Sequence, residues 1–375
     1  MARKNGRGKG NRQVGYAVIG LGHIAQAAVL PAFAHAQNAK LVALVSGDAQ
    51  KRTRLARKYH CDAYDVRDLD EVLDRPDIDA VYIAEPNDKH VDFAVRSAKE
   101  GVHVLCEKPL AISEEECRRM IDACREAGVK LMTAYRLHFE ESNLEAVKLV
   151  EQRKIGELRF FTSTFAYQVR PGNIRTSADR GGGAIWDLGP YCINAARYLF
   201  RADPVEVFAT RMDRREDERL KDVHEGMAVQ LKFPGERTAQ FTVSFGAYEQ
   251  DQYRLVGTKG HIELVDGYEY SGPRELRLSV RGKERVRKFK AADQFAPELI
   301  AFSKAILEDT DVEPDGEEGL RDVRVIVAAL KSAREDRSLT LSWPAPKRRP
   351  EPSDRIYRPP VREPHLVGVE APTLE

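Results

Sequence analysis

The chain has few cysteines, no long apolar run and no excess of either charge. Its 375 residues include five cysteines, an odd number, and none of them forms a C-x-x-C pair. This pattern argues against a disulfide framework or a structural zinc site and favours a reducing compartment. No run of about 18 apolar residues occurs, which argues against a membrane-spanning helix. The 60 Lys and Arg residues balance 59 Asp and Glu residues, so the overall charge does not indicate nucleic-acid or membrane-surface binding.

The two ends of the chain differ in composition from the rest. Residues 1–13 are glycine-rich and basic, which predicts a flexible arm; a solvated tail is favoured over an arm that binds a neighbouring subunit. No apolar stretch follows that could form a signal-peptide core, so we expect a cytoplasmic protein. Residues 344–375 are rich in proline, which prevents regular helix or central strand and predicts an extended tail on a surface.

The middle of the chain predicts two domains, because a chain of this length exceeds one ordinary domain. Residues 14–136 alternate short apolar runs with amphipathic stretches, which is typical of a doubly wound parallel sheet, the Rossmann arrangement. Residues 137–343 contain longer alternating stretches and three helical segments, which predict an α+β domain on a large, mostly antiparallel open sheet. The overall fold class is therefore α/β with an α+β second domain.

The stretch from Val14 to Ala25 reads as an apolar strand, a glycine turn and the start of a helix. Such a G-x-G-x-x-[GA] turn directs backbone N–H groups and a helix N-terminus at a pyrophosphate. Gly20 would permit the tight turn, Gly22 would let the ligand approach, and Ala25 would allow the helix to lie close to the strand. Alone, the motif could equally be a structural turn.

The end of the second predicted strand should decide the cofactor. An Asp or Glu there accepts hydrogen bonds from the ribose of NAD, but the residue after the apolar run is Ser46. A hydroxyl near Lys51 and Arg52 suits the 2′-phosphate of NADP. The alternative is that Asp48 binds the ribose of NAD and that the two basic residues are ordinary surface charges.

Polar residues follow the next two predicted strands. Glu85-Pro86-Asn87 comes after one and Glu107-Lys108-Pro109 after the other, at the edge where open α/β sheets collect ligands. Pro109 stiffens the backbone after Lys108, so this lysine is a candidate for polarising a substrate oxygen rather than a mobile surface charge.

Asp187 and Tyr191 follow three glycines in the stretch GGGAIWDLGPY. Within a helix over 183–199, side chains four residues apart share one face. Pro190 would disrupt a regular helix, so we expect a bend near Gly189-Pro190 or a helix that begins near Asp187. From these residues alone, the favoured interpretation is structural, with Asp187 as a helix cap and Tyr191 as a half-buried core residue.

Taken together, the segments GLGHIA, EPN, CEKPLA, YRLHFE, GGGAIWDLGPY and EEGLRDVRVI resemble those of the Gfo/Idh/MocA oxidoreductases. The likeness extends from Val14 to about Trp343 and is greatest to the glucose-fructose oxidoreductase branch. It implies an NADP-dependent sugar oxidoreductase without a metal, forming a homodimer or homotetramer through the second domain's sheet. The implied catalytic residues are Lys108, Asp187 and Tyr191, and Arg175 and Trp186 would lie near the substrate. The implied cofactor-binding residues are Gly20, Leu21, Gly22, His23, Ile24, Ser46, Lys51, Pro86, Asn87, His90, Glu107, Lys108 and Arg136.

The resemblance also implies a mechanism. Tyr191 would exchange a proton with the sugar oxygen while hydride passes to or from the nicotinamide, and Lys108 would stabilise the phenolate. Two other functions stay open: an enzyme that uses the nicotinamide transiently in glycoside cleavage, and a non-catalytic NADP-binding sensor. The presence of Lys108, Asp187 and Tyr191 together argues against a sensor.

Overall fold

A computed structural model describes residues 12–214, 216–344 and 348–374. Most of the expected N-terminal arm lies outside these ranges. Contacts divide the chain into two units, here called unit 1 and unit 2. Unit 1 comprises Met1–Arg136, Asp293–Leu320 and Arg358–Ala371, and unit 2 comprises Leu137–Ala292, Arg321–Tyr357 and Pro372–Glu375. The units are assembled from separate stretches, whereas the sequence analysis divides the chain into contiguous ones.

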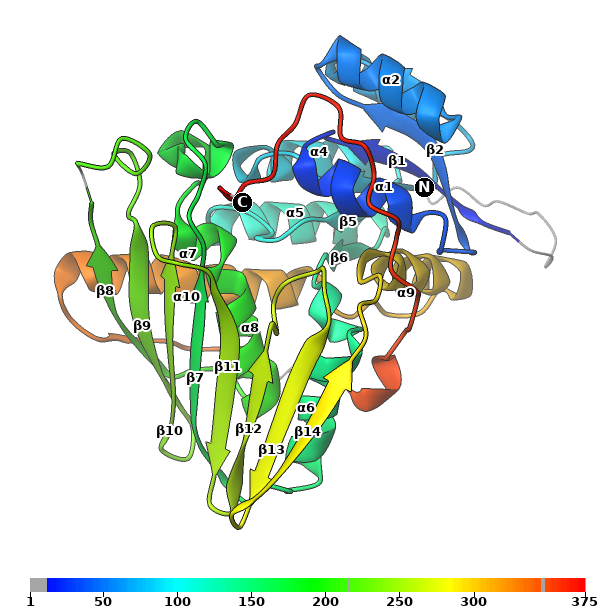
Figure 1. Ribbon diagram of the computed structural model, residues 1–375. Helices are drawn as coiled ribbons and strands as arrows, with labels where there is room; N and C mark the ends of the chain where they lie inside the picture. The colour runs from blue at the N-terminus through cyan, green and yellow to red at the C-terminus, as the bar shows by residue number, and fades with distance from the viewer. Residues whose placement is uncertain (1–11, 215, 345–347, 375) are drawn as a thin grey trace. The chain divides into compact units, whose positions relative to one another are not determined.

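Unit 1 contains the expected parallel sheet, with six strands in the order β3-β2-β1-β4-β5-β6 (Figure 1). The strand order reverses between β1 and β4, and ligands of open α/β sheets bind at the carboxyl ends of strands at such a switch point. Five strands are confirmed, but β3 was not predicted, because it has three residues and no apolar run. The strands are β1 (Val14–Ile19), β2 (Ala39–Val45), β3 (Asp62–Tyr64), β4 (Ala80–Ile83), β5 (His103–Cys106) and β6 (Leu131–Thr133).

Helices connect these strands, as the amphipathic pattern predicts. The N-cap residues fit the expected chemistry: Ser113 Oγ accepts the N–H of Glu116 at 3.2 Å at the start of α5. The Glu116 carboxylate accepts the N–H of Ile112 at 3.1 Å, one residue earlier than in a standard capping box. The elements are η1 (Ala25–Val29), α1 (Leu30–Ala32), α2 (Ala49–Tyr59), η2 (Val66–Asp68), α3 (Leu69–Leu73), η3 (Asn87–Lys89), α4 (His90–Lys99), α5 (Glu114–Ala127) and η4 (Arg136–His138).

Unit 1 also includes α9 (Phe295–Glu308), which the sequence division assigns to the second domain. Several of its apolar side chains, among them Leu299 and Phe302, are buried, and it contacts β1, β2 and η1. The hydroxyls of Tyr16 in β1 and Ser303 in α9 are 2.8 Å apart and share a hydrogen bond. The difference arises because α9 returns in space to a sheet that ended about 160 residues earlier, and no local pattern records such a return.

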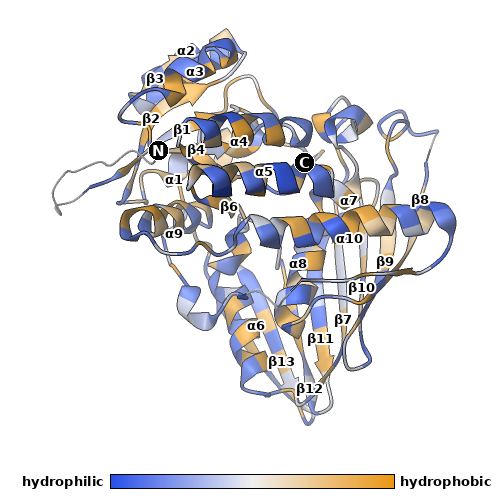
Figure 2. Cartoon of the chain, turned by 180° about the vertical axis from the view of Figure 1, so that it is seen from behind, coloured by the Kyte–Doolittle hydropathy of each residue, from blue (hydrophilic) through white to orange (hydrophobic). Residues whose placement is uncertain are grey.

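Unit 2 contains a nine-stranded sheet in the order β14-β13-β12-β11-β7-β10-β9-β8-β15. Its one parallel pair among the described residues is β7 with β10, so the expectation of a mostly antiparallel sheet is confirmed. Apolar and polar residues alternate along the strands, visible as bands of orange and blue in Figure 2. The strands are β7 (Leu158–Ala166), β8 (Glu206–Met212), β9 (Gly226–Phe233), β10 (Arg237–Ser244), β11 (Gln250–Gly257), β12 (Gly260–Val265), β13 (Arg274–Val280), β14 (Lys283–Phe289) and β15 (Leu339–Thr340).

Helices α6 and α8 contact one face of this sheet and bury it in a single apolar core. Helix α10 runs without a break from Gly316 to Glu335, although the boundary between the two units falls at residue 320. Among the described residues, no helix has both the length and the apolar composition needed to cross a membrane. The helical elements are α6 (Glu141–Glu151), η5 (Ile174–Thr176), η6 (Ala178–Arg180), α7 (Ala184–Asp187), α8 (Gly189–Phe200), α10 (Gly316–Glu335) and η7 (Pro352–Asp354).

A buried network of charges joins α8 to α10 inside unit 2. Arg197 is fully buried and donates to Asp203 at 2.8 Å and to Asp322. Asn194 donates to the other oxygen of Asp322 at 2.9 Å, and Arg321 donates to Asp203. Burial raises the pKa of Asp203, but the charges of Arg197 and its neighbours outweigh burial and lower it to about 2. Two residues of the EEGLRDVRVI segment, Arg321 and Asp322, therefore have a structural role in this network.

The tail after α10 has little regular structure, as its prolines predict, but part of it is fixed. Arg358 Nε donates to the carbonyl oxygen of His35 at 3.0 Å, and Val367 is buried against unit 1. Thr373 forms a bridge with Val169 in unit 2. Figure 1 shows the red tail running beside α1, turning back in a loop and ending at the C-terminus.

Candidate active site

The glycine turn of unit 1 lies at the switch point of the sheet. Gly20 has φ of +94°, and a Cβ there would be 2.6 Å from the carbonyl oxygen of Ala84, so only glycine fits against the end of β4. At Gly22, by contrast, a Cβ would meet no atom within 4 Å. The backbone at Gly22 therefore faces open space, as the approach of a pyrophosphate requires. Leu21 is buried between the two glycines, and His23 and Ile24 begin the helix, as predicted.

The segment after β2 contains Asp48, Lys51 and Arg52, and their contacts show which of them have a structural role. Asp48 is the N-cap of α2, and its carboxylate accepts the N–H groups of Lys51 at 3.0 Å and Gln50 at 2.9 Å, which lowers the pKa of Asp48. Arg52 pairs with Asp65 at 2.9 Å and donates to the carbonyl oxygen of Ser46. Lys51 Nζ lies 3.6 Å from the exposed Asp48 carboxylate. Capping thus occupies Asp48, and Arg52 is fixed in an ion pair.

His90 connects the segments that follow β4 and β5. The ring is fully buried, with Nε2 2.9 Å from the carbonyl oxygen of Glu85 and Nδ1 3.0 Å from that of Pro109. Burial lowers the pKa of His90. Both ring nitrogens face backbone carbonyls, so the contacts of His90 position these two segments. Pro86 is the N-cap of η3, and Asn87 is its first residue.

Glu107 and Lys108 stand at the end of β5, before a cis Lys108-Pro109 bond. Glu107 is buried, and it accepts the Tyr82 hydroxyl at 2.8 Å and the N–H of Lys108 at 3.2 Å. Burial raises the pKa of Glu107, whereas the charge of Lys108 opposes the rise. Lys108 itself is partly exposed.

Two further charged residues of unit 1 are close enough to Glu107 to interact with it electrostatically. Arg136 is 5% exposed, donates to the side chain of Gln294 and lies over the ring of Phe295 at 5.9 Å. The second is Glu298, which was not predicted; it is a fully buried carboxyl in α9 with no hydrogen-bond partner for either oxygen. Burial and the nearby charge of Glu107 raise the pKa of Glu298 well above its usual range. The one sequence signal is an acidic residue on the apolar face of a helix.

Asp187 and Tyr191 lie in unit 2, on two short helices rather than one. Helix α7 ends at Asp187 and α8 begins at Gly189, with Leu188 between them and Pro190 in the first turn of α8. The expected single helix over 183–199 is therefore wrong, and the bend lies where the proline predicts it, because proline is accepted in a first turn but not in a helix interior.

The Asp187 carboxylate accepts hydrogen bonds from Tyr167 and Arg175. Tyr167 donates its hydroxyl to Oδ2 at 2.7 Å, and Arg175 Nε donates to the same oxygen at 2.9 Å. Burial by itself would lower the pKa of the Arg175 guanidinium. The negative charge of Asp187 outweighs burial and raises this pKa above its ordinary value. The structure thus places Arg175, expected near the substrate, on the catalytic candidate Asp187. Tyr167 was not predicted as a partner of Asp187, since a tyrosine at a strand end gives no specific signal.

Tyr191 is half-buried and packs on aromatic rings. Its ring lies 5.5 Å from Phe165, edge to face, and 6.0 Å from Tyr268. Trp186 instead lines a cavity of about 220 Å³ with Gly183, Asp213 and His224, and Asp187 is not among the residues that line this cavity. In the described part of the chain, no group of three or more His, Cys, Asp and Glu residues is arranged to hold a metal ion.

Two family descriptions match this chain, one within each unit. Residues 14–135 match a family described as "Oxidoreductase family, NAD-binding Rossmann fold", and residues 143–263 match the "GFO/IDH/MocA C-terminal domain". A D-xylose 1-dehydrogenase [NADP(+)] of Haloarcula marismortui is 30% identical over 88% of this chain and 93% of its own. The crystal structure of an aldose-aldose oxidoreductase from Caulobacter crescentus, complexed with glycerol, has a TM-score of 0.85 and 36% identity over 88% of this chain and all of that one. The 3-ketoreductase KijD10 from Actinomadura kijaniata, in complex with NADP and TDP-benzene, has a TM-score of 0.79 and 26% identity over 86% and 98% of the two chains.

Proposed function

This chain belongs to the Gfo/Idh/MocA family of oxidoreductases, and on that premise we propose that it transfers a hydride between NADP and a sugar carbon bearing a hydroxyl or carbonyl group. The observation that carries the proposal is the open backbone at Gly22, at the switch point of a Rossmann sheet. NADP-dependent xylose dehydrogenases and an aldose-aldose oxidoreductase among the relatives support a sugar as the substrate.

The residues of unit 1 fit NADP. The turn Gly20-Leu21-Gly22 would hold the pyrophosphate, and Ser46 with Lys51 would hold the 2′-phosphate, because β2 ends without an acidic residue in that position. Pro86, Asn87, Glu107 and Lys108 follow the ends of β4 and β5, on the side proposed for the nicotinamide. When bound, NADP supplies the carbon that accepts or donates the hydride.

The residues of this chain would move the proton. Tyr191 is proposed as the general acid and base at the sugar oxygen, and the ammonium group of Lys108 as the charge that stabilises the phenolate. Tyr167 and Arg175 fix the orientation of the Asp187 carboxylate, so Asp187 can orient a substrate hydroxyl without rotating.

The purified protein tests this proposal directly. We expect it to bind NADPH in preference to NADH and to change the absorbance of the reduced cofactor when a panel of aldoses is added. A preference for NADH would show that the roles given to Ser46 and Lys51 are wrong. Cleavage of a glycoside without a net absorbance change would indicate transient use of the nicotinamide. Binding of NADPH without reaction with any sugar would indicate a sensor.

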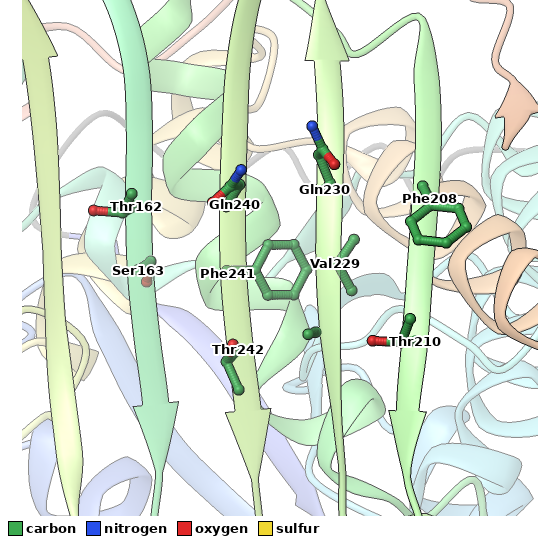
Figure 3. Close-up of a pocket in the computed structure, with 10 residues that line it drawn as sticks. Thr162, Ser163, Phe208, Thr210, Val229, Gln230, Gln240, Phe241 and Thr242 are labelled. Carbon is green, nitrogen blue, oxygen red and sulfur yellow. The ribbon is translucent and has the colours of Figure 1, made fainter.

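We further propose that the protein forms a homodimer or homotetramer through the uncovered face of the large sheet. A shallow hollow of about 350 Å³ lies on this sheet, and Figure 3 shows uncharged side chains on its strands, among them Thr162, Gln230 and Gln240. Charged residues are depleted from the centres of stable interfaces, which this composition matches.

Placing a charge on this face is expected to separate the subunits. Gln240→Lys would bury an unpaired ammonium group in each interface, so we expect the mass in solution to fall to that of a monomer. Gln50→Lys, at the exposed start of α2, is the matched control and should leave the mass unchanged. Light scattering after gel filtration measures both; a wild-type monomer, or an unchanged Gln240→Lys oligomer, would contradict the proposal.

We also place the protein in the cytoplasm. The five cysteines are free thiols, as a reducing compartment favours, and cell fractionation would test this assignment.

A further inference from the structure

The C-terminal segment from His365 to Gly368, here called the clasp, lies on the cofactor-binding side of unit 1. Val367 in the clasp is 341 residues from its partner Gln26, which lies in η1, the helical segment after the glycine turn. Val367 is 8% exposed, so the clasp is buried at this point rather than loosely attached. The neighbouring prolines restrict the backbone, which reduces the entropy lost when the segment is held in place.

Gln26 joins the clasp to the glycine turn through one side chain. Its amide nitrogen donates to the carbonyl oxygens of Leu21 at 2.9 Å and Val367 at 3.0 Å, and its oxygen accepts the N–H of Val367 at 2.7 Å. The side chain is 1% exposed, and these three hydrogen bonds all join it to backbone atoms. Because the same side chain bonds to both, a displacement of the clasp would also change the hydrogen bond to Leu21, the middle residue of the turn.

The clasp also reaches helix α2. Lys58 Nζ donates to the carbonyl oxygen of His365 at 3.3 Å. A Cβ built at Gly368, where φ is +59°, would lie 3.4 Å from Cε of Lys51. The clasp thus contacts the elements that follow both β1 and β2, whose carboxyl ends bind the phosphates of a dinucleotide.

We propose that the clasp retains NADP, because it must detach from Gln26 before the groups around the glycine turn can open and release the cofactor. This inference rests on the proposed function. It assigns Gln26 and Val367 a positioning role in cofactor retention.

The rate of NADPH release from full-length protein tests the clasp. In Val367→Asp a charge replaces a buried apolar side chain and should detach the clasp, and in Gln26→Leu the side-chain hydrogen bonds are lost with little change of volume. Loss of the two hydrogen bonds between Gln26 and Val367, each of ordinary strength, should raise the release rate about tenfold or more. Val361→Asp makes the same chemical change earlier in the tail, outside the clasp, and should release NADPH at the wild-type rate. Fluorescence of bound NADPH, displaced by excess NADP, gives the rate, and circular dichroism verifies that each variant is folded.

The outcomes are distinct. Release within twofold of wild type in both folded clasp variants would overturn the proposal. Slower release would also overturn it, since it would show that the clasp competes with the cofactor. Failure of the wild type to bind NADPH would overturn the proposed function itself, and the clasp with it.

Discussion

Replacing Tyr191 by phenylalanine is expected to lower the turnover of sugar at least about a hundredfold while NADP still binds. The substitution removes only the hydroxyl that we propose as general acid and base, and such groups contribute about a hundredfold or more. The ring contacts with Phe165 and Tyr268 are retained, so the fold should be unchanged. Steady-state kinetics with a reactive aldose, together with NADPH titration, would measure the two effects separately.

Tyr198 provides a matched control on the same helix. It is buried, and its hydroxyl donates to Asn143 at 2.9 Å inside the core of unit 2. Tyr198→Phe should therefore reduce stability, with turnover kept within a few-fold of wild type. A Tyr191→Phe enzyme that turns over within threefold of wild type would remove Tyr191 from the mechanism.

Replacing Arg197 by methionine is expected to lower the free energy of unfolding by about 3–5 kcal/mol. The change leaves the buried carboxylate of Asp322 without its guanidinium partner, and removal of one member of a buried ion pair costs this much. Urea denaturation followed by circular dichroism would measure the loss.

Arg118→Met is the control for this prediction. Arg118 forms an ion pair with Glu114 at 2.8 Å on the surface of α5, and exposed pairs of this kind contribute about 0.3–0.5 kcal/mol. If Arg197→Met lowered the free energy of unfolding no more than Arg118→Met, the buried network would not stabilise unit 2.

Much of unit 1 could be predicted from local sequence. Short apolar runs mark β1, β2, β4, β5 and β6. Gly20 marks the turn after β1, because a side chain at this position would collide with the backbone of Ala84. Pro190 likewise indicated the bend between α7 and α8, since its effect on a helix is local. Such features are visible because the cause and the structure lie within a few residues.

The partners of the candidate site residues could not be predicted, because they lie far away in the sequence or give no specific signal. Nothing in the sequence near Asp187 indicates Tyr167, and nothing near Gln26 indicates Val367. The pairing of Arg175 with Asp187 is equally hidden, since arginine suits a substrate or a carboxylate equally well. Whether the sugar meets Lys108, Asp187 and Tyr191 together stays a prediction for the kinetic experiments.

The way unit 1 is assembled bears on its synthesis in the cell. Its last sheet strand ends at Thr133, but Tyr16 meets its partner Ser303 only 287 residues later in the chain, and Gln26 meets Val367 only near the C-terminus. A ribosome releases the chain from its N-terminus, so the nucleotide-binding sheet emerges early and stays without α9 and the clasp while unit 2 is being made. The first part of the protein to be translated is thus the last to be completed.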